Sequence, residues 1–329
     1  MTNIAILGAG SIARAMAKTL RGMKEQGEEV CLYAVASRDF ARAQVFADAE
    51  GFQKAYGSYE EMVCDPAVEL VYIATPHSHH AAHVRLCVEH GKAVLCEKAF
   101  TANAAQAQEV LTLAEDRGVL VTEAIWTRYM PSREIIQSFI TKGAIGDPVL
   151  LTANLGYPVA DRERIKQPEL AGGSLLDLGV YPLNFASMVF GTDVAQVEGT
   201  CSKLPTGVDE TDNITLTFGD GRQALLSACC SCRMDRRGMI YGTTGYLEVD
   251  NINNPQTITL YTKKDNYAYG TVYPVPKQIT GYEYEVMACL DALKSGRIEC
   301  PEMPHQETLR MMRLMDQLRY SWGIRYPFE

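Results

Sequence analysis

Short apolar segments alternate with longer helical segments over the first 122 residues of this 329-residue chain, and no other feature restricts its possible folds as strongly. Glycines such as Gly51 and Gly118 follow several of the helical segments, as is common at helix C-termini. The alternation predicts repeated βαβ units and a doubly wound parallel sheet with helices on both faces. We expect strands at 3–7, 30–36, 70–74, 93–96 and 119–122, and helices at 12–24, 41–50, 81–90 and 104–117.

Beyond about residue 148 the pattern changes to strand-like segments that are separated by turn residues. Gly219-Asp220-Gly221 is a strong hairpin signal between two of them. We expect one large open antiparallel sheet, with helices at 173–190, 282–295 and 306–322 covering one face. The chain is thus predicted to be an α/β protein with an N-terminal domain over 1–122 and a C-terminal α+β domain over 123–329. The expected C-terminal strands are 149–157, 194–203, 213–218, 223–232, 239–241, 246–250 and 257–262.

Composition excludes several classes of partner. The formal net charge of -9 argues against binding to nucleic acid or to an anionic membrane surface. No apolar stretch approaches the roughly 18 residues that a membrane helix needs, and we expect no signal peptide. The ten cysteines are scattered, which favours reduced thiols in the cytoplasm, and Cys230-Ser231-Cys232 lacks the second ligand pair of a zinc site.

A glycine-rich turn, Gly8-Ala9-Gly10-Ser11-Ile12-Ala13, lies between the first expected strand and the first expected helix. In dinucleotide-binding sheets the first glycine allows the tight turn and the second lets the backbone approach a pyrophosphate. The small last residue lets the helix pack on the strand, and amides at the helix N-terminus face the anion. Because the turn opens a βαβ series, it predicts dinucleotide binding through Gly8, Gly10, Ser11, Ile12 and Ala13.

The end of the second expected strand bears on which dinucleotide binds. NAD-specific sites usually carry an acidic residue there, which binds the ribose 2′-hydroxyl. This chain has Ser37 and Arg38 instead, and Arg38 and Arg42 lie four residues apart at the start of the next helix, where both could hold a 2′-phosphate. The sequence therefore favours NADP. Asp39 leaves NAD possible, and a solvated arginine pair is the alternative interpretation.

Four of the six histidines lie within residues 73–83, between a strand and a helix. His80 and His83 are one helical turn apart, but no Cys, Asp or Glu completes a ligand set within the segment, so we expect no metal. The segment follows a parallel strand at its carboxyl end, where ligands bind in such sheets. Thr75, Pro76 and His80 are therefore expected to lie near the nicotinamide of the dinucleotide.

Glu97 and Lys98 end another buried-looking strand, so they too are expected at the cofactor edge of the sheet. A lysine in this position can polarise or deprotonate an alcohol during hydride transfer. The alternative is an ordinary Glu-Lys pair on the surface.

Several short motifs are distributed along nearly the whole chain. They are the glycine turn, Thr75-Pro76 with His80, Glu97-Lys98, and the segments 123–131, 172–181 and 242–245. Together they resemble the Gfo/Idh/MocA oxidoreductases. The segment 126–128 and Tyr181, where many members carry histidine, are most similar to the branch of dimeric dihydrodiol dehydrogenases and NADP-dependent D-xylose dehydrogenases. The family usually has proline after the Glu-Lys pair, whereas this chain has Ala99, which bears on the placement of Lys98.

The resemblance implies a Rossmann domain that binds the dinucleotide and a second domain that binds substrate and forms a homodimer through its open sheet. It also implies that Lys98, Asp177 and Tyr181 line the site beside the nicotinamide. Tyr181 would be the general acid/base, Lys98 would lower the pKa of its phenol from about 10, and Asp177 would orient substrate hydroxyls. Asp177 and Tyr181 share a helix face by spacing, although Pro182 fits a helix start better than an interior.

Trp126 and Arg128 are carried over from the same resemblance as residues that line the cleft beside the cofactor. A packed junction with a buried aromatic side chain is the alternative for both.

The leading hypothesis for function is an NADP-dependent dehydrogenase that moves a hydride between the nicotinamide and a secondary alcohol of a sugar, polyol or vicinal diol. The alternatives are an NAD-dependent inositol or amino-sugar dehydrogenase, a non-catalytic NADPH sensor, and a Rossmann protein for another nucleotide such as an S-adenosyl donor. Intact Lys98, Asp177 and Tyr181 argue against a sensor, which needs no proton relay. The sequence does not identify the substrate or the direction of the reaction.

Overall fold

The computed structural model describes residues 1–263, 267 and 269–329. The chain divides into two compact units, one of residues 1–129 with 278–312 and one of residues 130–277 with 313–329. The division near residue 129 lies close to the boundary expected at 122. That residues 278–312 join the first unit is not visible in the sequence pattern. Within the described ranges, no helix has the length and apolar character needed to cross a membrane.

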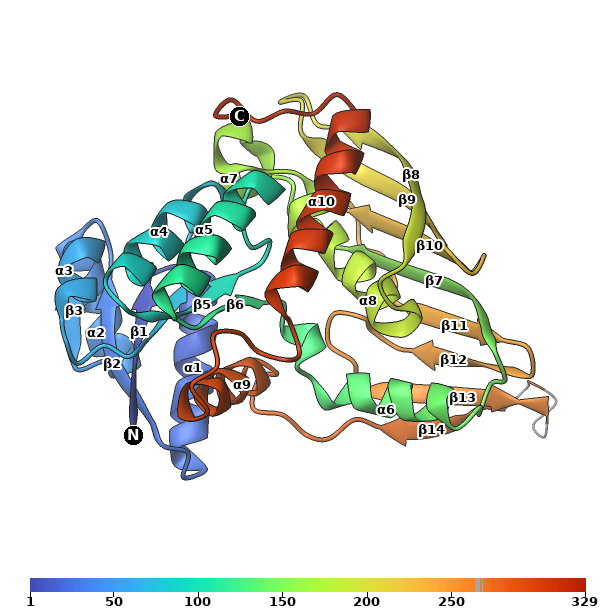
Figure 1. Ribbon diagram of the computed structural model, residues 1–329, viewed down its shortest axis with the longest axis horizontal. Coiled ribbons are helices and arrows are strands. Elements are labelled where there is room, and N and C mark those ends of the chain that lie inside the picture. The colour runs from blue at the N-terminus through green and yellow to red at the C-terminus, as the bar shows by residue number, and fades with distance from the viewer. Residues whose placement is uncertain (264–266, 268) are drawn as a thin grey trace. The chain divides into compact units, whose positions relative to one another are not determined.

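The first unit contains a sheet of strands in the order β3-β2-β1-β4-β5-β6, in which every neighbouring pair is parallel (Figure 1). This confirms the predicted doubly wound sheet, since right-handed crossovers on either side of β1 place helices on both faces. Its elements are β1 Thr2–Leu7, α1 Ser11–Glu25, β2 Val30–Ala36, α2 Phe40–Glu50, β3 Lys54–Tyr56, α3 Tyr59–Cys64, β4 Leu70–Ile73, α4 His77–Glu89, β5 Ala93–Glu97, α5 Ala104–Arg117, β6 Val121–Ala124, the 3₁₀ turn η1 Trp126–Arg128 and α9 Glu283–Lys294.

Burial explains which of these elements the sequence revealed. All residues of β2 are buried, as expected for a central strand that is covered on both faces. β3 and α3 were not predicted, because three and six residues are too few to establish a periodicity. Helix α4 begins at His77 rather than at 81, directly after Pro76, so the histidine-rich segment is the first part of a helix and not a loop. β6 begins at Val121, two residues later than expected.

The second unit contains a sheet in the order β14-β13-β12-β11-β7-β10-β9-β8 (Figure 1). Its elements are α6 Pro131–Thr141, β7 Pro148–Gly156, α7 Glu163–Lys166, the 3₁₀ turn η2 Pro168–Leu170, the π-helical turn η3 Leu175–Gly179, α8 Val180–Phe190, β8 Val194–Lys203, β9 Asp209–Phe218, β10 Gln223–Cys229, β11 Gly238–Gly242, β12 Gly245–Val249, β13 Thr257–Thr262 and β14 Thr271–Pro274. Helix α10, His305–Ser321, begins within the first unit's residues and ends within those of the second.

The strand directions correct one expectation. Neighbouring strands are antiparallel except β7 and β10, which are parallel, so the sheet is mostly but not purely antiparallel. Strands β8 and β9 and helices α7 and α8 separate β7 from β10, and a connection of that length permits a parallel pair where a hairpin cannot. The turn at Gly219–Gly221 joins antiparallel β9 and β10, as predicted.

The helices cover the second sheet differently from expectation. Helix α8 contacts β7 and β10 and buries nearly all of its residues. Helix α9, which was expected to cover this sheet, instead contacts β5 and α1 of the first unit. An apolar stripe indicates that a helix has a buried face, but it does not say which sheet that face covers.

Candidate functional site

The glycine turn between β1 and α1 has the geometry of an anion site. Gly8 has a φ of +111°, and a Cβ there would lie 2.9 Å from the carbonyl oxygen of Ala74. Gly10 precedes α1 without any side-chain cap, and a Cβ there would meet nothing within 4 Å. Ser11 is exposed, whereas Ala13 is fully buried between helix and sheet. Uncapped amides at a helix N-terminus with open space before them fit a pyrophosphate.

The end of β2 holds its polar residues in defined contacts. Asp39 caps α2, because its carboxylate accepts a hydrogen bond from the backbone N–H of Arg42 at 3.3 Å. The Arg42 guanidinium reaches back to the glycine turn and donates to the carbonyl of Ala9 at 2.9 Å. The Ser37 hydroxyl accepts from the Asp39 N–H at 3.4 Å. Since α2 begins at Phe40 and Asp39 is its N-cap, Arg38 precedes the helix, and the expectation that both arginines lie at the start of this helix is wrong for Arg38.

Arg38 faces the start of α4 instead. Burial lowers the pKa of His79, and the positive charge of Arg38 lowers it further. Both Arg38 and Arg42 are exposed, so two cations flank the end of β2 without being part of one helical stripe.

His80 joins two turns at the carboxyl edge of the parallel sheet. Its side chain is fully buried, with Nε2 2.8 Å from the Thr75 carbonyl oxygen and Nδ1 3.0 Å from that of Ala99. Burial lowers the pKa of His80 to about 4, while the carbonyl oxygens that face both ring nitrogens act in the opposite direction. His80 thus connects the turn at Thr75 to the turn at Ala99. Thr75 and Pro76, by contrast, are partly exposed.

Glu97 and Lys98 follow one another at the end of β5. Glu97 is buried and accepts a hydrogen bond from the hydroxyl of Tyr72. Burial, together with the charge of Glu97, raises the pKa of Tyr72 well above its ordinary value, so Tyr72 remains a donor. Lys98 is half-buried, and the peptide bond between Lys98 and Ala99 is cis.

Trp126 and Arg128 are packed within the first unit. The indole of Trp126 stacks on the ring of Tyr282, with centroids 4.4 Å apart. The guanidinium of Arg128 is 5% exposed and forms an ion pair with Glu307. Both side chains are therefore packed against residues of the segment 278–312, and their expected place beside the cofactor stays a prediction.

Two buried acidic residues of the first unit, Glu123 and Glu285, were not identified as candidates from the sequence. Burial raises the pKa of Glu123, at the end of β6, to about 7. Burial and the charge of Glu97 raise the pKa of Glu285, on α9, well above its ordinary value. Neither oxygen of Glu285 has a hydrogen-bond partner. The sequence gives no signal for Glu285, because its burial depends on the return of residues 278–312 to this unit.

In the second unit, Asp177 and Tyr181 lie on one continuous helical run. Asp177 is in the π-helical turn η3 and Tyr181 is in the first turn of α8, and both are buried. Pro182 also lies in that first turn, directly after the π-helical turn, and it supplies no N–H to the helical run. Arg164 of α7 forms an ion pair with the Asp177 carboxylate. Arg164 was not identified from the sequence, since it is one of several charges in an unpatterned segment.

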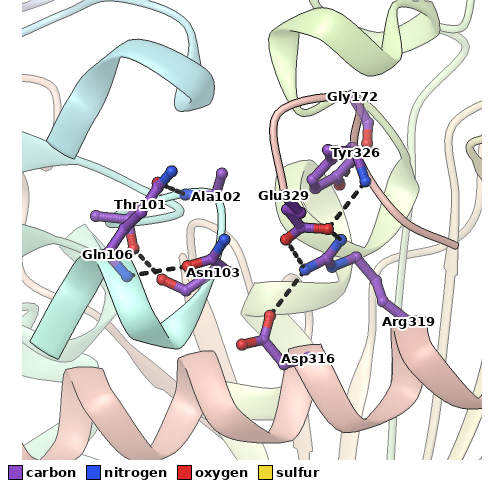
Figure 2. Close-up of polar contacts among 9 residues, drawn as sticks. All are labelled: Thr101, Ala102, Asn103, Gln106, Gly172, Asp316, Arg319, Tyr326 and Glu329. Carbon is purple, nitrogen blue, oxygen red and sulfur yellow. Dashed lines mark hydrogen bonds and ion pairs between the residues drawn. The ribbon is translucent and has the colours of Figure 1, made fainter. Parts of the chain in front are cut away.

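Buried polar groups brace the glycine pair that precedes this run. Asp209 accepts a hydrogen bond from the backbone N–H of Leu175, and a Cβ on Gly173 would collide with the Asp209 carboxylate. The hydroxyl of Tyr326 donates to the Gly172 carbonyl at 2.8 Å, and both residues are labelled in Figure 2. The chain terminus that carries Tyr326 is itself held by Arg319, which is fully buried and binds the Glu329 carboxylate with both terminal nitrogens (Figure 2).

The candidate residues are thus divided between the units. The glycine turn, the end of β2, His80, Glu97 and Lys98 gather at the carboxyl edge of the parallel sheet in the first unit. Asp177 and Tyr181 belong to the second. Among the residues that the structure describes, no group of three or more His, Cys, Asp or Glu side chains is arranged to hold a metal ion.

A doubly wound sheet with an open glycine turn at its carboxyl edge defines a dinucleotide-binding protein. Residues 2–125 match the description "Oxidoreductase family, NAD-binding Rossmann fold", and residues 134–248 match the "GFO/IDH/MocA C-terminal domain". The chain belongs to the Gfo/Idh/MocA oxidoreductase family, which confirms the family that its motifs predicted.

Relatives named trans-1,2-dihydrobenzene-1,2-diol dehydrogenase align along almost the whole chain. The Mus musculus protein is 32% identical over 333 residues, which cover 98% of this chain and 97% of that protein. The Bos taurus protein is 34% identical over 330 residues, with the same coverage.

Solved structures share the fold. A 3-ketoreductase from Actinomadura kijaniata, in complex with NADP and TDP-benzene, has a TM-score of 0.85 and 23% identity over 97% of each chain. A levoglucosan dehydrogenase, in complex with NADH and L-sorbose, has a TM-score of 0.87 and 18% identity over 98% of this chain and 97% of that one.

Proposed function

We propose that this oxidoreductase transfers a hydride between NADP(H) and a secondary alcohol of a vicinal diol, polyol or sugar. The observation that carries the proposal is the similarity, over nearly the full chain, to relatives named for a vicinal diol substrate. The residues expected to do the chemistry are all present, with Lys98 at the carboxyl edge of the parallel sheet and Asp177 and Tyr181 on one helical run.

The preference for NADP rests on the end of β2. Asp39 is the acidic residue that follows this strand in the sequence, and its carboxylate caps α2. Arg42 reaches the glycine turn and Arg38 is exposed beside it, so two guanidinium groups are available to a 2′-phosphate. A planar guanidinium suits such an anion because it donates two parallel hydrogen bonds.

Each catalytic residue has a distinct role in this proposal. The nicotinamide, when bound, supplies or accepts the hydride. Tyr181 would transfer the proton of the substrate hydroxyl, and the Lys98 ammonium would stabilise the phenolate. Asp177 would bind a neighbouring hydroxyl, with Arg164 fixing the direction of its carboxylate. A vicinal diol offers one hydroxyl to each of Tyr181 and Asp177, which is why two acceptors on one helix face favour this substrate class.

The cofactor preference is tested by binding. We expect NADPH to raise the unfolding temperature of the chain more than NADH at equal concentration, since a ligand stabilises the state that it binds. Arg42→Ala should remove most of this difference, whereas Arg21→Ala, which alters an exposed arginine of α1 paired with Glu50, should preserve it. Equal shifts with both dinucleotides in the unaltered chain would contradict a preference for NADP.

The proton-transfer role is tested by turnover of a panel of vicinal diols, inositols and aldoses, followed through the absorbance of the reduced nicotinamide. Tyr181→Phe should lower kcat about 100-fold or more while leaving the dissociation constant of NADPH unchanged. Tyr320→Phe, on the part-exposed surface of α10, serves as the control. Full turnover by Tyr181→Phe would show that another group moves the proton.

We also propose that the chain forms a homodimer through the open face of its second sheet. Side chains of these strands point alternately into the core and onto the open face. On the open face, Leu225 of β10 is 44% exposed. Beside it lies a hollow of about 630 Å³, which suits an inserted partner surface. The hollow is lined mainly by outward residues of β7 to β10, among them Thr152, Asn154, Thr200, Asn213 and Ser227.

A further inference from the structure

Two thiols lie together at the end of β10, outside the residues assigned to catalysis. Strand β10 ends at Cys229, three residues before the end expected from the sequence, and the chain bends through Cys230 and Ser231 to Cys232. Cys229 is 5% exposed and Cys232 is exposed. Each of these two residues lies near enough to the other to shift its pKa. The spacing Cys-X-X-Cys is that of many reversible dithiols.

The sulfur of Cys229 accepts several hydrogen bonds. The hydroxyl of Thr211, its partner across β9, donates at 3.2 Å, and the backbone N–H of Ser231 donates at 3.4 Å. Burial alone would raise the pKa of Cys229, but these bonds and those from Cys232 outweigh burial and lower the pKa below its ordinary value. The Cys229 thiolate, which is the reactive form of a thiol, is therefore favoured.

Neighbouring cysteines show that this environment is specific. Burial raises the pKa of Cys230 to about 12, so the thiol between the pair is inert. Cys289 of α9 also has a close thiol neighbour, Cys300, and both are fully buried. There the hydrogen bond with Cys300, burial and the nearby carboxylate of Glu285 raise the pKa of Cys289 well above its ordinary value. Proximity of two thiols alone therefore does not favour a thiolate in this chain.

We propose that Cys229 and Cys232 form a redox-active dithiol whose oxidant is a hydroperoxide. The Cys229 thiolate attacks the terminal oxygen of the peroxide, and the O–O bond breaks. Cys229 becomes a sulfenic acid, and the departing oxygen takes up a proton to leave as water or as an alcohol. The Cys232 sulfur then displaces the hydroxyl group from the Cys229 sulfur. That group leaves as water with the Cys232 proton, and two thiols have lost two electrons to form one disulfide.

Oxidation of this pair would change the proposed active site through the backbone hydrogen bonds that anchor residues 157–160. The N–H of Tyr157 donates to the Cys229 carbonyl at 3.1 Å, and those of Val159 and Ala160 donate to the Cys230 carbonyl at 2.8 and 2.9 Å. The segment held in this way leads directly into α7, which carries Arg164, the partner of Asp177. Closing a disulfide across residues 229–232 would reshape the bend that anchors this segment. This coupling, unlike the dithiol itself, rests on the proposed function.

The dithiol is tested by mapping disulfides in the intact reduced chain after exposure to hydrogen peroxide. We expect one intramolecular disulfide between Cys229 and Cys232, detected by mass spectrometry of peptides after free thiols are blocked. Cys289 and Cys300 should remain reduced. Cys229→Ser and Cys232→Ser should abolish the disulfide, and Cys64→Ser, at an isolated exposed thiol of α3, should preserve it. Failure of the pair to form, or a bond from either thiol to Cys230 or to a second copy, would overturn the proposal.

Activity of the same samples tests the coupling. We expect turnover to fall several-fold in the oxidised chain, to recover with dithiothreitol, and to become insensitive to peroxide in Cys232→Ser. An oxidised chain with unchanged turnover would overturn the coupling. A reduced chain that turns over no alcohol would instead overturn the proposed function. The disulfide mapping would still test the dithiol proposal independently.

Discussion

At the scale of single residues, burial rather than charge pairing sets the pKa of two acids of the first unit, Glu123 and Glu285. Glu123 illustrates this, because it accepts a hydrogen bond from the Phe100 N–H at 3.0 Å and still has a pKa raised to about 7 by burial. In the unfolded chain the same carboxyl releases its proton near the ordinary value of 4.5. The folded state therefore binds more protons over this interval, and the free energy of unfolding falls as pH rises from about 4.5 to about 7.

Glu123→Gln should remove this dependence, because glutamine keeps the acceptor for Phe100 and does not titrate. Relative to the unaltered chain, the variant should gain up to about 3 kcal/mol in free energy of unfolding between pH 4.5 and pH 8. Urea unfolding at the two pH values measures the difference. Glu25→Gln, at an exposed position of α1, is the control and should show no such gain. A Glu123→Gln profile parallel to that of the unaltered chain would contradict the assignment.

At the scale of elements, local capping explains why α5 was located correctly. Figure 2 shows the Asn103 carboxamide accepting from the Gln106 N–H at 2.9 Å and the Gln106 side chain accepting from the Ala102 N–H at 3.3 Å. The Thr101 hydroxyl donates to the Asn103 carbonyl at 2.7 Å. The bonds to the Gln106 and Ala102 N–H groups satisfy backbone donors that would otherwise lack a partner at the helix start.

Asn103→Ala should therefore cost about 1 kcal/mol in free energy of unfolding, the usual value of an N-cap. Asn103→Asp keeps an acceptor at the same position and should be nearly as stable as the unaltered chain. Chemical denaturation of the three proteins makes the comparison. Equal stability of Asn103→Ala would mean that the cap contributes nothing here.

Other elements were missed or misplaced for identifiable reasons. Strands β2, β8 and β13 match their expected bounds, because each combines continuous or alternating apolar residues with clear turn residues. Helix α6 was not predicted, although its apolar residues Ile135, Ile136 and Phe139 recur with helical spacing. Strand β14 was also not predicted, because it is short and largely exposed. A weakly buried element leaves little periodicity in its sequence.

At the scale of the whole molecule, the proposed dimer concerns the face of the second sheet on which Leu225 is exposed. Leu225→Glu places a charge at the centre of that face, where it would have to lose its hydration on association. We expect the unaltered chain to be a dimer and this variant a monomer by light scattering, with an unchanged circular dichroism spectrum. Val45→Glu alters an apolar residue that is 70% exposed on α2 and should remain a dimer. A monomeric unaltered chain would contradict the proposal.

The sequence by itself determined what depends on neighbouring residues: the parallel sheet, the glycine turn before α1, and the spacing of Asp177 and Tyr181. These features follow from backbone sterics and from the periodic burial of side chains. Both leave a pattern that can be recognised within a short stretch of sequence. Only the tertiary structure decided that β7 pairs with β10 in parallel, that α9 joins the first unit, and that Arg164 binds Asp177. Each of these depends on a particular partner chosen from elsewhere in the fold, and hydrophobic periodicity carries no information about which partner that is.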